Sequence, residues 1–254
     1  MSKPLILVCN DDGVFAPGIE ALTEVAKEFG DVIVVAPDKP QSGAGHGITI
    51  NDTLRIREVK KEQGLEVYST TGTPVDCIKL AVNEIMHRKP DLLISGINHG
   101  SNASINVIYS GTMSAAIEGA MEGIPSIGFS LLDHSIDADF SASKDIARKI
   151  VPEILKKGLP KGVCLNVNIP KLHIEEIRGI KVCHQANGNW VEEFDARKDP
   201  SGQSYFWMTG KFVNFEENEE NDIALLEQSY VSVVPVQFDM TAYKAMEQIS
   251  NYDL

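Results

Sequence analysis

The sequence predicts an α/β protein in which a Rossmann-like parallel sheet is flanked by helices. Apolar runs at residues 5–10, 32–37 and 91–96 have the length and composition of strands that are buried on both faces. Stretches with helical spacing of apolar residues separate these runs, and such alternation places helices on both faces of a parallel sheet. A chain of 254 residues, 43% of them hydrophobic, can bury a core of this kind without disulfide bonds.

Strand and helix signals alternate as far as residue 169. Proline fits the first turn of a helix and glycine often ends one, so Pro17 and Gly30 mark one helix and Pro74 opens another. Two stretches of alternating polarity after the second strand resemble the strands of a hairpin. The predicted strands are 5–10, 32–37, 48–58, 65–69, 91–96, 126–130 and 163–169. The predicted helices are 17–29, 74–85, 111–123 and 141–157.

The alternation ends near residue 185, so we expect a core at 1–185 and a C-terminal elaboration at 186–254. The C-terminal part is expected to form a β-hairpin and helix arm used for oligomerisation, with a strand at 231–238 and a helix at 241–251. Both tryptophans lie before that strand, and the aromatic side chains around them either contact another subunit or pack on the chain's own core. The acidic run at 216–222 is expected to be a solvated loop.

Composition excludes several classes of function. The net charge of −13 argues against a protein that reads DNA or RNA, because such a surface repels phosphate backbones. It also repels a small phosphorylated substrate unless a bound cation reverses the charge locally. No apolar run approaches the ~20 residues of a membrane span, and the four cysteines lack disulfide or zinc spacing. We therefore expect a cytoplasmic protein without a signal peptide, whose partner is a small molecule rather than a nucleic-acid duplex or a membrane.

Polar, glycine-rich loops follow three of the predicted strands, and ligands bind at the carboxyl ends of such strands. The loops contain Asp11 and Asp12, then Ser42, then Asn98. Adjacent carboxylates repel each other unless a cation lies near them, so this set favours a metal site over a simple turn or helix cap. Oxygen ligands alone point to a hard divalent ion, Mg²⁺, Mn²⁺ or Ca²⁺.

A phosphate site is predicted where the helix at 111–123 begins. Ser110 is a natural N-cap, and the free N–H groups of the first turn, around Gly111 and Thr112, can bind an anion. The glycines at 43, 45 and 47 either form a second anion-binding nest or make a mobile loop. The chain lacks both GxGxxG after the first strand and the GxxxxGK[ST] of a P-loop, which argues against a nicotinamide-dependent oxidoreductase and a P-loop enzyme.

Three other polar residues lie in these loops or at the start of a predicted helix. Asp76 follows Thr73 at the spacing of a capping box, and we interpret it as part of the helix cap. His46 and His99 lie in the candidate loops and could assist proton transfer, but most loop histidines have no such role.

Several spaced motifs together resemble the SurE family, the survival proteins of stationary phase. The resemblance covers the N-terminal two-thirds of the chain in order. The motifs are Asn10-Asp11-Asp12-Gly13 with Pro17-Gly18, Gln41-Ser42-Gly43, Gly72-Thr73-Pro74, Ser95-Gly96-Ile97-Asn98 and Tyr109-Ser110-Gly111-Thr112.

The resemblance implies a divalent-metal-dependent phosphatase of nucleoside monophosphates, mainly a 5′-nucleotidase. It also implies a C-terminal arm exchanged within a homodimer or homotetramer, and one Mg²⁺ or Mn²⁺ per subunit. The implied metal ligands are Asp11, Asp12, Ser42 and Asn98, and the implied phosphate and substrate residues are Asn102, Ser110, Gly111 and Thr112. Ser104 departs from the family, which usually has a glycine in this loop.

We therefore expect hydrolysis of nucleoside 5′-monophosphates to nucleoside and phosphate, with 3′-monophosphates and polyphosphate as further candidate substrates. The catalytic residues would be Asp11 and Asp12, which either activate water or supply an aspartyl nucleophile. The alternative is a non-catalytic nucleotide sensor on the same fold, whose expected mark, the loss of one carboxylate, is absent from this sequence.

Overall fold

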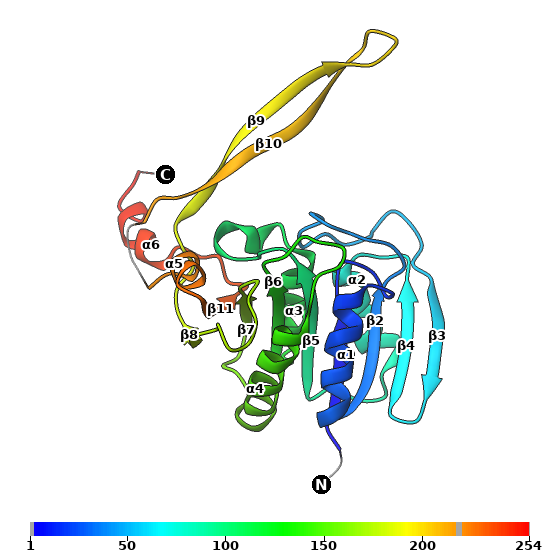
Figure 1. Ribbon diagram of the computed structural model, residues 1–254. Helices are drawn as coiled ribbons and strands as arrows, with labels where there is room; N and C mark the ends of the chain where they lie inside the picture. The colour runs from blue at the N-terminus through cyan, green and yellow to red at the C-terminus, as the bar shows by residue number, and fades with distance from the viewer. Residues whose placement is uncertain (1–2, 217–219, 254) are drawn as a thin grey trace.

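A mostly parallel sheet of nine strands runs through the protein, and a second sheet of two strands projects from it (Figure 1). The structure is a computed structural model that describes residues 3–216 and 220–253. The order of the central sheet is β3-β4-β2-β1-β5-β6-β7-β11-β8. Its strands are β1 (Leu5–Cys9), β2 (Asp31–Pro37), β3 (Ile56–Glu62), β4 (Leu65–Thr70), β5 (Leu92–His99), β6 (Ser126–Leu131), β7 (Val163–Ile169), β8 (Gly179–Val182) and β11 (Tyr230–Gln237).

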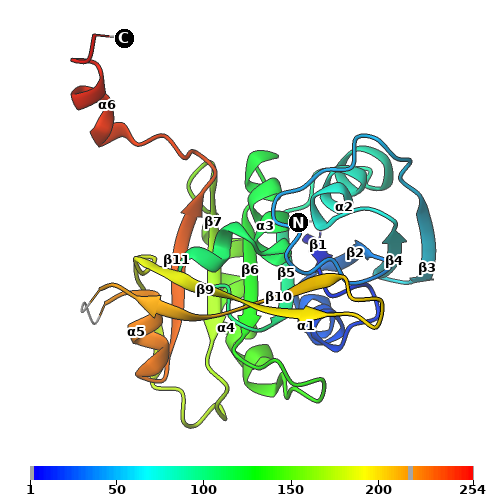
Figure 2. The ribbon, with the colours of Figure 1, turned by 90° about the horizontal axis from the view of Figure 1, so that it is seen from above.

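Helices cover both faces of this sheet, as the alternation predicts (Figure 2). One face carries α1 (Pro17–Phe29) and α4 (Ser141–Lys157), and the other carries α2 (Pro74–Leu80) and α3 (Gly111–Met121). Alternate residues of β1 enter the two cores, Ile6 and Val8 on the α1 face and Leu7 and Cys9 on the α2 face. A strand without a solvent face has no polar positions, which explains why β1 is an unbroken apolar run.

The start of α1 packs directly on β5, next to the edge where the candidate loops lie. Pro17 occupies the first helical position, and a Cβ added at Gly18 would lie 2.0 Å from the carbonyl oxygen of Ile97. Only glycine permits such a close approach between the helix and the strand. The Pro17-Gly18 motif therefore positions the end of β5, and with it Asn98, relative to the turn that follows β1.

Five features differ from the predicted elements. Residues 48–55 form no strand, because Thr49 bonds to Asp76 on α2 rather than to a partner strand, and the hairpin strand begins only at β3. The second helix continues as a π-helix, η1 (Ala81–Ile85). A short 3₁₀ helix, η2 (Ser104–Ile108), precedes α3. The strand β8 and the helix α5 (Asp222–Glu227) were not predicted.

The expected C-terminal arm is present. Strands β9 (Gly188–Lys198) and β10 (Ser204–Asn214) form a long antiparallel ribbon that leaves the body, and α6 (Tyr243–Ile249) lies beyond the central sheet (Figures 1 and 2). Between them the chain returns to the body, where β11 pairs antiparallel with β7. Trp190 packs against Phe212 within the ribbon, whereas the Trp207 side chain is 60% exposed.

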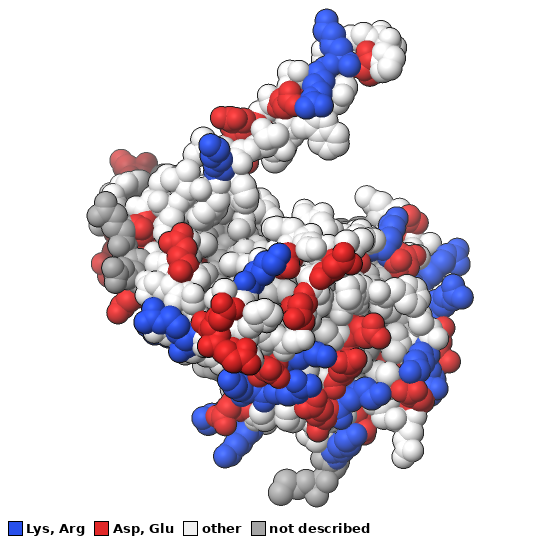
Figure 3. Space-filling view, in the orientation of Figure 1, with Lys and Arg blue, Asp and Glu red and all other residues white. Residues whose placement is uncertain are grey.

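The surface carries charges of both signs. In the view of Figure 3, Lys and Arg side chains are interspersed with Asp and Glu over the body, so neither sign forms one large patch on this face. Among the described residues, no helix has the length and apolar composition needed to cross a membrane.

Candidate active site

The predicted carboxylates and Asn98 meet at one edge of the sheet. β1 lies between β2 and β5 and runs parallel to both, so the segments after these three strands leave the same edge. Asp11 and Asp12 form the turn after β1, Ser42 lies in the loop after β2, and Asn98 is at the end of β5. The backbone N–H of His99 points to Asp12 Oδ2 at 3.4 Å, which places the end of β5 beside the acidic turn.

The N-terminus of α3 contacts Asp11 directly. Thr112 Oγ1 donates a hydrogen bond of 2.5 Å to Asp11 Oδ1. A Cβ added at Gly111 would lie 2.6 Å from the Cβ of Asp11, so glycine is needed for this approach. Ser110 is the N-cap, and its side chain accepts the Met113 N–H at 3.0 Å. The predicted phosphate turn is therefore adjacent to the predicted metal ligands.

Burial changes the charge state of the acidic pair. The side chain of Asp11 is 4% exposed, and this burial raises its pKa to about 6, although the Thr112 hydrogen bond opposes the shift and the Asp12 charge adds to it. Burial also raises the pKa of Asp12, with the neighbouring His99 acting in the opposite direction. Two carboxylates whose ionised forms are disfavoured by burial and mutual repulsion are stabilised by a nearby cation.

The donor atoms at this edge suit a hard divalent ion. The side-chain nitrogen of Asn98 donates to the carbonyl oxygens of His99 and Gly100 at 3.3 and 3.0 Å, which leaves Asn98 Oδ1 available as a ligand. Carboxylate, amide and hydroxyl oxygens are the donors that Mg²⁺, Mn²⁺ and Ca²⁺ prefer. Within the described chain no cluster of three or more His, Cys, Asp or Glu side chains is arranged for a metal.

Ser42 lies at the exposed tip of the loop after β2. The loop is tied to the site on its first side, because the Gln41 N–H donates to the carbonyl oxygen of Asp11 at 2.8 Å. The Gly45 N–H donates to the carbonyl oxygen of Tyr109, just before the phosphate turn, at 3.2 Å. These two bonds hold the loop beside the acidic turn and the predicted phosphate turn, and Ser42 stays a predicted ligand.

The far side of this loop is held by two buried carboxylates. His46 Nε2 lies 2.9 Å from Glu118 on α3, which also pairs with Lys79. Asp76 accepts hydrogen bonds from the N–H and hydroxyl groups of Thr49 and also completes the capping box of α2. The interpretation of Asp76 as a cap is confirmed, and the structure gives His46 the role of a loop anchor.

Asn102, in the segment that follows β5, is part of a buried network of polar side chains. Its side-chain nitrogen donates to Ser130 Oγ at 2.7 Å, and its N–H donates to Asn168 Oδ1 at 2.8 Å. The Asn166 side chain donates to the Asn102 carbonyl oxygen at 2.8 Å. Sequence analysis did not single out Asn166 or Asn168; the available signal was two asparagines inside an otherwise apolar strand. The substrate-binding role of Asn102 stays a prediction.

Residues of the C-terminal part of the chain hold the loop that leads to the predicted phosphate turn. Ser104 has a φ of +54°, and its N–H donates to Asp222 Oδ2 at 2.7 Å while its hydroxyl donates to the Ala186 carbonyl oxygen at 2.8 Å. Trp190 Nε1 donates to Asn106 Oδ1 at 2.8 Å. These bonds explain how serine occupies a backbone conformation that usually favours glycine.

The prediction of a solvated acidic loop is wrong at its end. Asp222 is fully buried, and its carboxylate accepts the N–H groups of Ser104, Ala186 and Ile223. Asn221 is also buried and caps α5 by accepting the Ala224 N–H. Residues 217–219 of the run lie outside the described residues. Backbone donors from distant segments thus compensate a charge that composition alone assigns to solvent.

The fold and the site together define a Rossmann-like phosphoryl-transfer enzyme with an acidic, oxygen-rich edge and an adjacent helix N-terminus. The chain matches the profile of the family described as Survival protein SurE over residues 6–192, so it belongs to the SurE family.

Full-length relatives and a solved structure agree with this assignment. A protein named 5′-nucleotidase SurE from Christiangramia forsetii is 61% identical over 254 residues, which is 99% of this chain and 98% of the relative. One of the same name from Flavobacterium johnsoniae is 59% identical, with coverage of 99% and 98%. A crystal structure of the SurE protein from Aquifex aeolicus is 40% identical with a TM-score of 0.84, covering 97% of this chain and 98% of the other.

Two substitutions test the contacts of Ser104. Ser104→Ala keeps the left-handed backbone conformation unfavourable and removes the hydrogen bond to Ala186, which costs about 1–3 kcal/mol of unfolding free energy. Ser104→Gly loses the same bond but adopts positive φ without strain, so it should be less destabilised. Urea unfolding of both variants measures the difference. Equal unfolding free energies of the two variants would contradict backbone strain at position 104.

Proposed function

We propose that this protein hydrolyses nucleoside 5′-monophosphates at the edge formed by Asp11, Asp12 and the start of α3. The contact between buried Asp11 and Thr112 carries the proposal, because it joins a carboxylate pair to an anion-binding helix terminus. Relatives named 5′-nucleotidase SurE, 61% and 59% identical over nearly the whole chain, support the same activity. Nucleoside 3′-monophosphates and polyphosphate are further candidate substrates.

The proposed cofactor is one divalent ion per subunit, Mg²⁺ or Mn²⁺, held by Asp11, Asp12, Ser42 and Asn98. When bound, such an ion polarises the phosphoryl group and lowers the pKa of water. The burial of Asp11 and the available Asn98 oxygen support this set, because both suit a hard cation.

The residues of the chain divide the work between binding and proton transfer. The Ser110 N–H is bonded to the Asn106 carbonyl oxygen at 3.1 Å, so of the proposed residues Ser110, Gly111 and Thr112 it is the N–H groups of Gly111 and Thr112, at the positive end of α3, that would bind the non-bridging phosphate oxygens. Asp11 is fixed by Thr112, whereas Asp12 is less buried and, among the described residues, is contacted by a backbone N–H at the long distance of 3.4 Å. We therefore assign Asp12 the role of orienting the attacking water and accepting its proton.

The proposed partners are the nucleotide and further copies of the chain. The net charge of −13 and the interspersed surface charges in Figure 3 suit a small substrate rather than a nucleic-acid duplex. We place the protein in the cytoplasm, without a membrane partner. The ribbon and α6 carry exposed apolar side chains, which supports a homodimer or homotetramer with arms exchanged between subunits. These side chains include Phe206, Trp207, Met208, Tyr243 and Met246.

Asp11→Asn tests the catalytic site. The substitution removes the negative charge of one ligand, while the amide oxygen of asparagine can still accept from Thr112, so phosphate release from AMP with saturating Mn²⁺ should fall about a hundredfold or more. Asp145→Asn, which removes one charge from α4, where Asp145 pairs with Arg148, is the matched control. Near-normal release by Asp11→Asn at saturating metal would contradict the mechanism.

Thermal melts with EDTA and with Mn²⁺ test the ion site. An ion that binds only the native state adds about 2.7 kcal/mol at a hundredfold excess over Kd, or roughly 5–10 °C for a domain of this size. We expect this shift at pH 7.5 and a smaller one at pH 5, where Asp11, with a pKa of about 6, is mostly protonated.

The sign of the pH effect follows from Asp11. Without metal, its raised pKa contributes stability that is complete below about pH 4 and is lost as the pH rises through about 6. Metal removal should therefore be most damaging above pH 6. Identical melting curves with EDTA and Mn²⁺ at pH 7.5 would count against the ion site.

Truncation before Thr241 tests the arm. The deletion removes α6, whose residues are not buried by the chain itself, so the particle should become smaller without loss of the central sheet. Light scattering on the full-length and truncated proteins measures the masses. A full-length particle of one chain mass, 27.8 kDa, at micromolar concentration would rule out arm exchange.

A further inference from the structure

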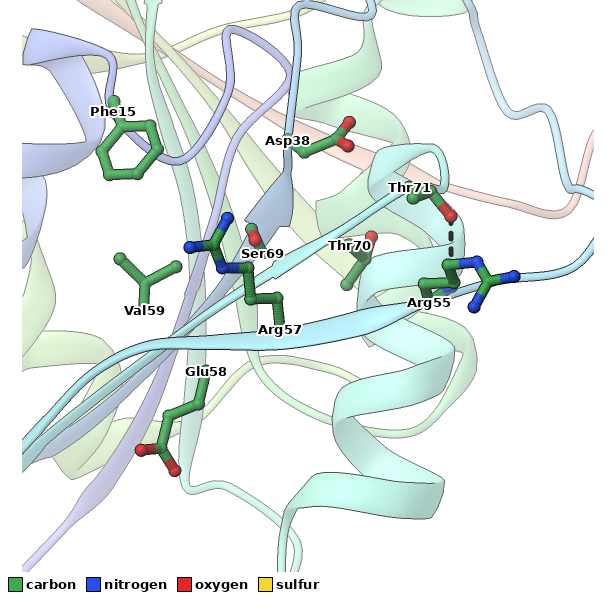
Figure 4. Close-up of a pocket in the computed structure, with 9 residues that line it drawn as sticks. All are labelled: Phe15, Asp38, Arg55, Arg57, Glu58, Val59, Ser69, Thr70 and Thr71. Carbon is green, nitrogen blue, oxygen red and sulfur yellow. Dashed lines mark hydrogen bonds between the residues drawn. The ribbon is translucent and has the colours of Figure 1, made fainter.

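A hollow of about 370 Å³ opens at the same edge of the sheet as Asp11 and Asp12. Its walls come from the loop after β1, the ends of β2 and β4, and the exposed strand β3 (Figure 4). The residues that matter for its chemistry are Phe15, Asp38, Arg57, Val59 and Ser69. None of these residues has a part in the metal and phosphate sites described above.

The walls of the hollow are hydrogen-bonded to the segments that carry the active site. The Val14 N–H, next to Phe15, donates to the Pro37 carbonyl oxygen at 2.9 Å. The loop that continues from Asp38 reaches the Asp11 carbonyl oxygen through the Gln41 N–H at 2.8 Å. β4 is two strands from β1, a separation of about 10 Å. The hollow thus adjoins the loops after β1 and β2, which also carry Asp11, Asp12 and Gln41.

Two side chains here have no structural explanation. Phe15 is 80% exposed, and among the described residues it has no aromatic partner. Figure 4 shows the Arg57 guanidinium projecting toward Phe15, with Glu58 pointing away from the hollow. No described carboxylate pairs with Arg57, although the lysines of the same strand, Lys60 and Lys61, both form ion pairs.

An aromatic face beside a free guanidinium matches the chemistry of a purine base. Bases stack on aromatic side chains, and an arginine can donate two parallel hydrogen bonds to O6 and N7 of guanine. Adenine presents an amino donor at the same edge, so it would not accept both bonds. Asp38, on the rim, is an acceptor suited to the ribose hydroxyl groups.

We propose that the hollow between Phe15 and Arg57 binds the base of the nucleotide substrate and favours 6-oxopurines such as guanine. This assignment rests on the proposed function of the Asp11 and Asp12 edge, and it makes Phe15 and Arg57 residues that determine specificity. Phe15 stacks on the base, and Arg57 reads its O6 and N7 edge.

The test compares a substrate that has a base with one that has none. For the full-length protein with Mn²⁺, kcat/KM is measured with GMP and with p-nitrophenyl phosphate. Arg57→Gln and Phe15→Ala should each lower the GMP to p-nitrophenyl phosphate ratio about tenfold. Both side chains are exposed, so neither change empties the core. Lys61→Gln, on the same strand but paired with Glu66, is the control and should keep the ratio.

A second measurement separates this inference from the proposed function. Calorimetric titration with guanosine, which carries no phosphate, measures base binding without turnover. Loss of guanosine binding in Arg57→Gln and its retention in Lys61→Gln support the hollow, even for a protein that releases no phosphate from either substrate. An unchanged GMP ratio in both hollow variants, or no guanosine binding to the unaltered protein, overturns the proposal.

Discussion

The contact between Asp11 and the first turn of α3 is the constraint on which the rest of the site depends. It brings the end of the central strand β1 against a helix N-terminus, with Thr112 donating to the carboxylate and a glycine at 111 leaving the necessary room. The segments that are bonded to Asp11 and Asp12 are held beside this contact. The loop after β2 is bonded to the Asp11 carbonyl oxygen, and the end of β5 is bonded to Asp12. A buried carboxylate, the N-terminus of a helix and the polar residues of two neighbouring loops therefore share one edge of the sheet.

Longer-range contacts connect this edge to the arm. Ser104 and Asn106 lie in the segment that leads to Ser110. Ser104 is bonded to Asp222, the first residue of α5, and Asn106 is bonded to Trp190 in β9. Burial raises the pKa of Asp222, and the backbone N–H groups that it accepts compensate part of that cost. Through these bonds, the ribbon and the segment at 104–109 that leads to Ser110 belong to one hydrogen-bonded network.

Much of the architecture could be predicted because it depends on local patterns. The buried strands are apolar runs, helices begin at Pro17, at Pro74 and directly after the N-cap Ser110, and the polar loops follow the parallel strands. From the sequence, Asp11 and Thr112 could be predicted only to lie near each other. The hydrogen bond between them depends on how α3 packs on the sheet. Ser104 and Asp222 are 118 positions apart, and no periodicity indicates that they bond. The helix α5 escaped prediction because it is six residues long and begins within an acidic run that reads as solvated.

The proposed ion and the substrate phosphate lie next to each other at one edge of the sheet, so each should strengthen the binding of the other. Calorimetric titration of inorganic phosphate into the protein, with EDTA and then with saturating Mn²⁺, measures this coupling directly. The account predicts that phosphate affinity rises at least about tenfold with Mn²⁺, a coupling of roughly 1.4 kcal/mol. It also predicts that Gly111→Ala, whose added Cβ would press on Asp11, weakens this coupling. Equal phosphate affinity with and without Mn²⁺ would contradict a joint site at Asp11 and the start of α3.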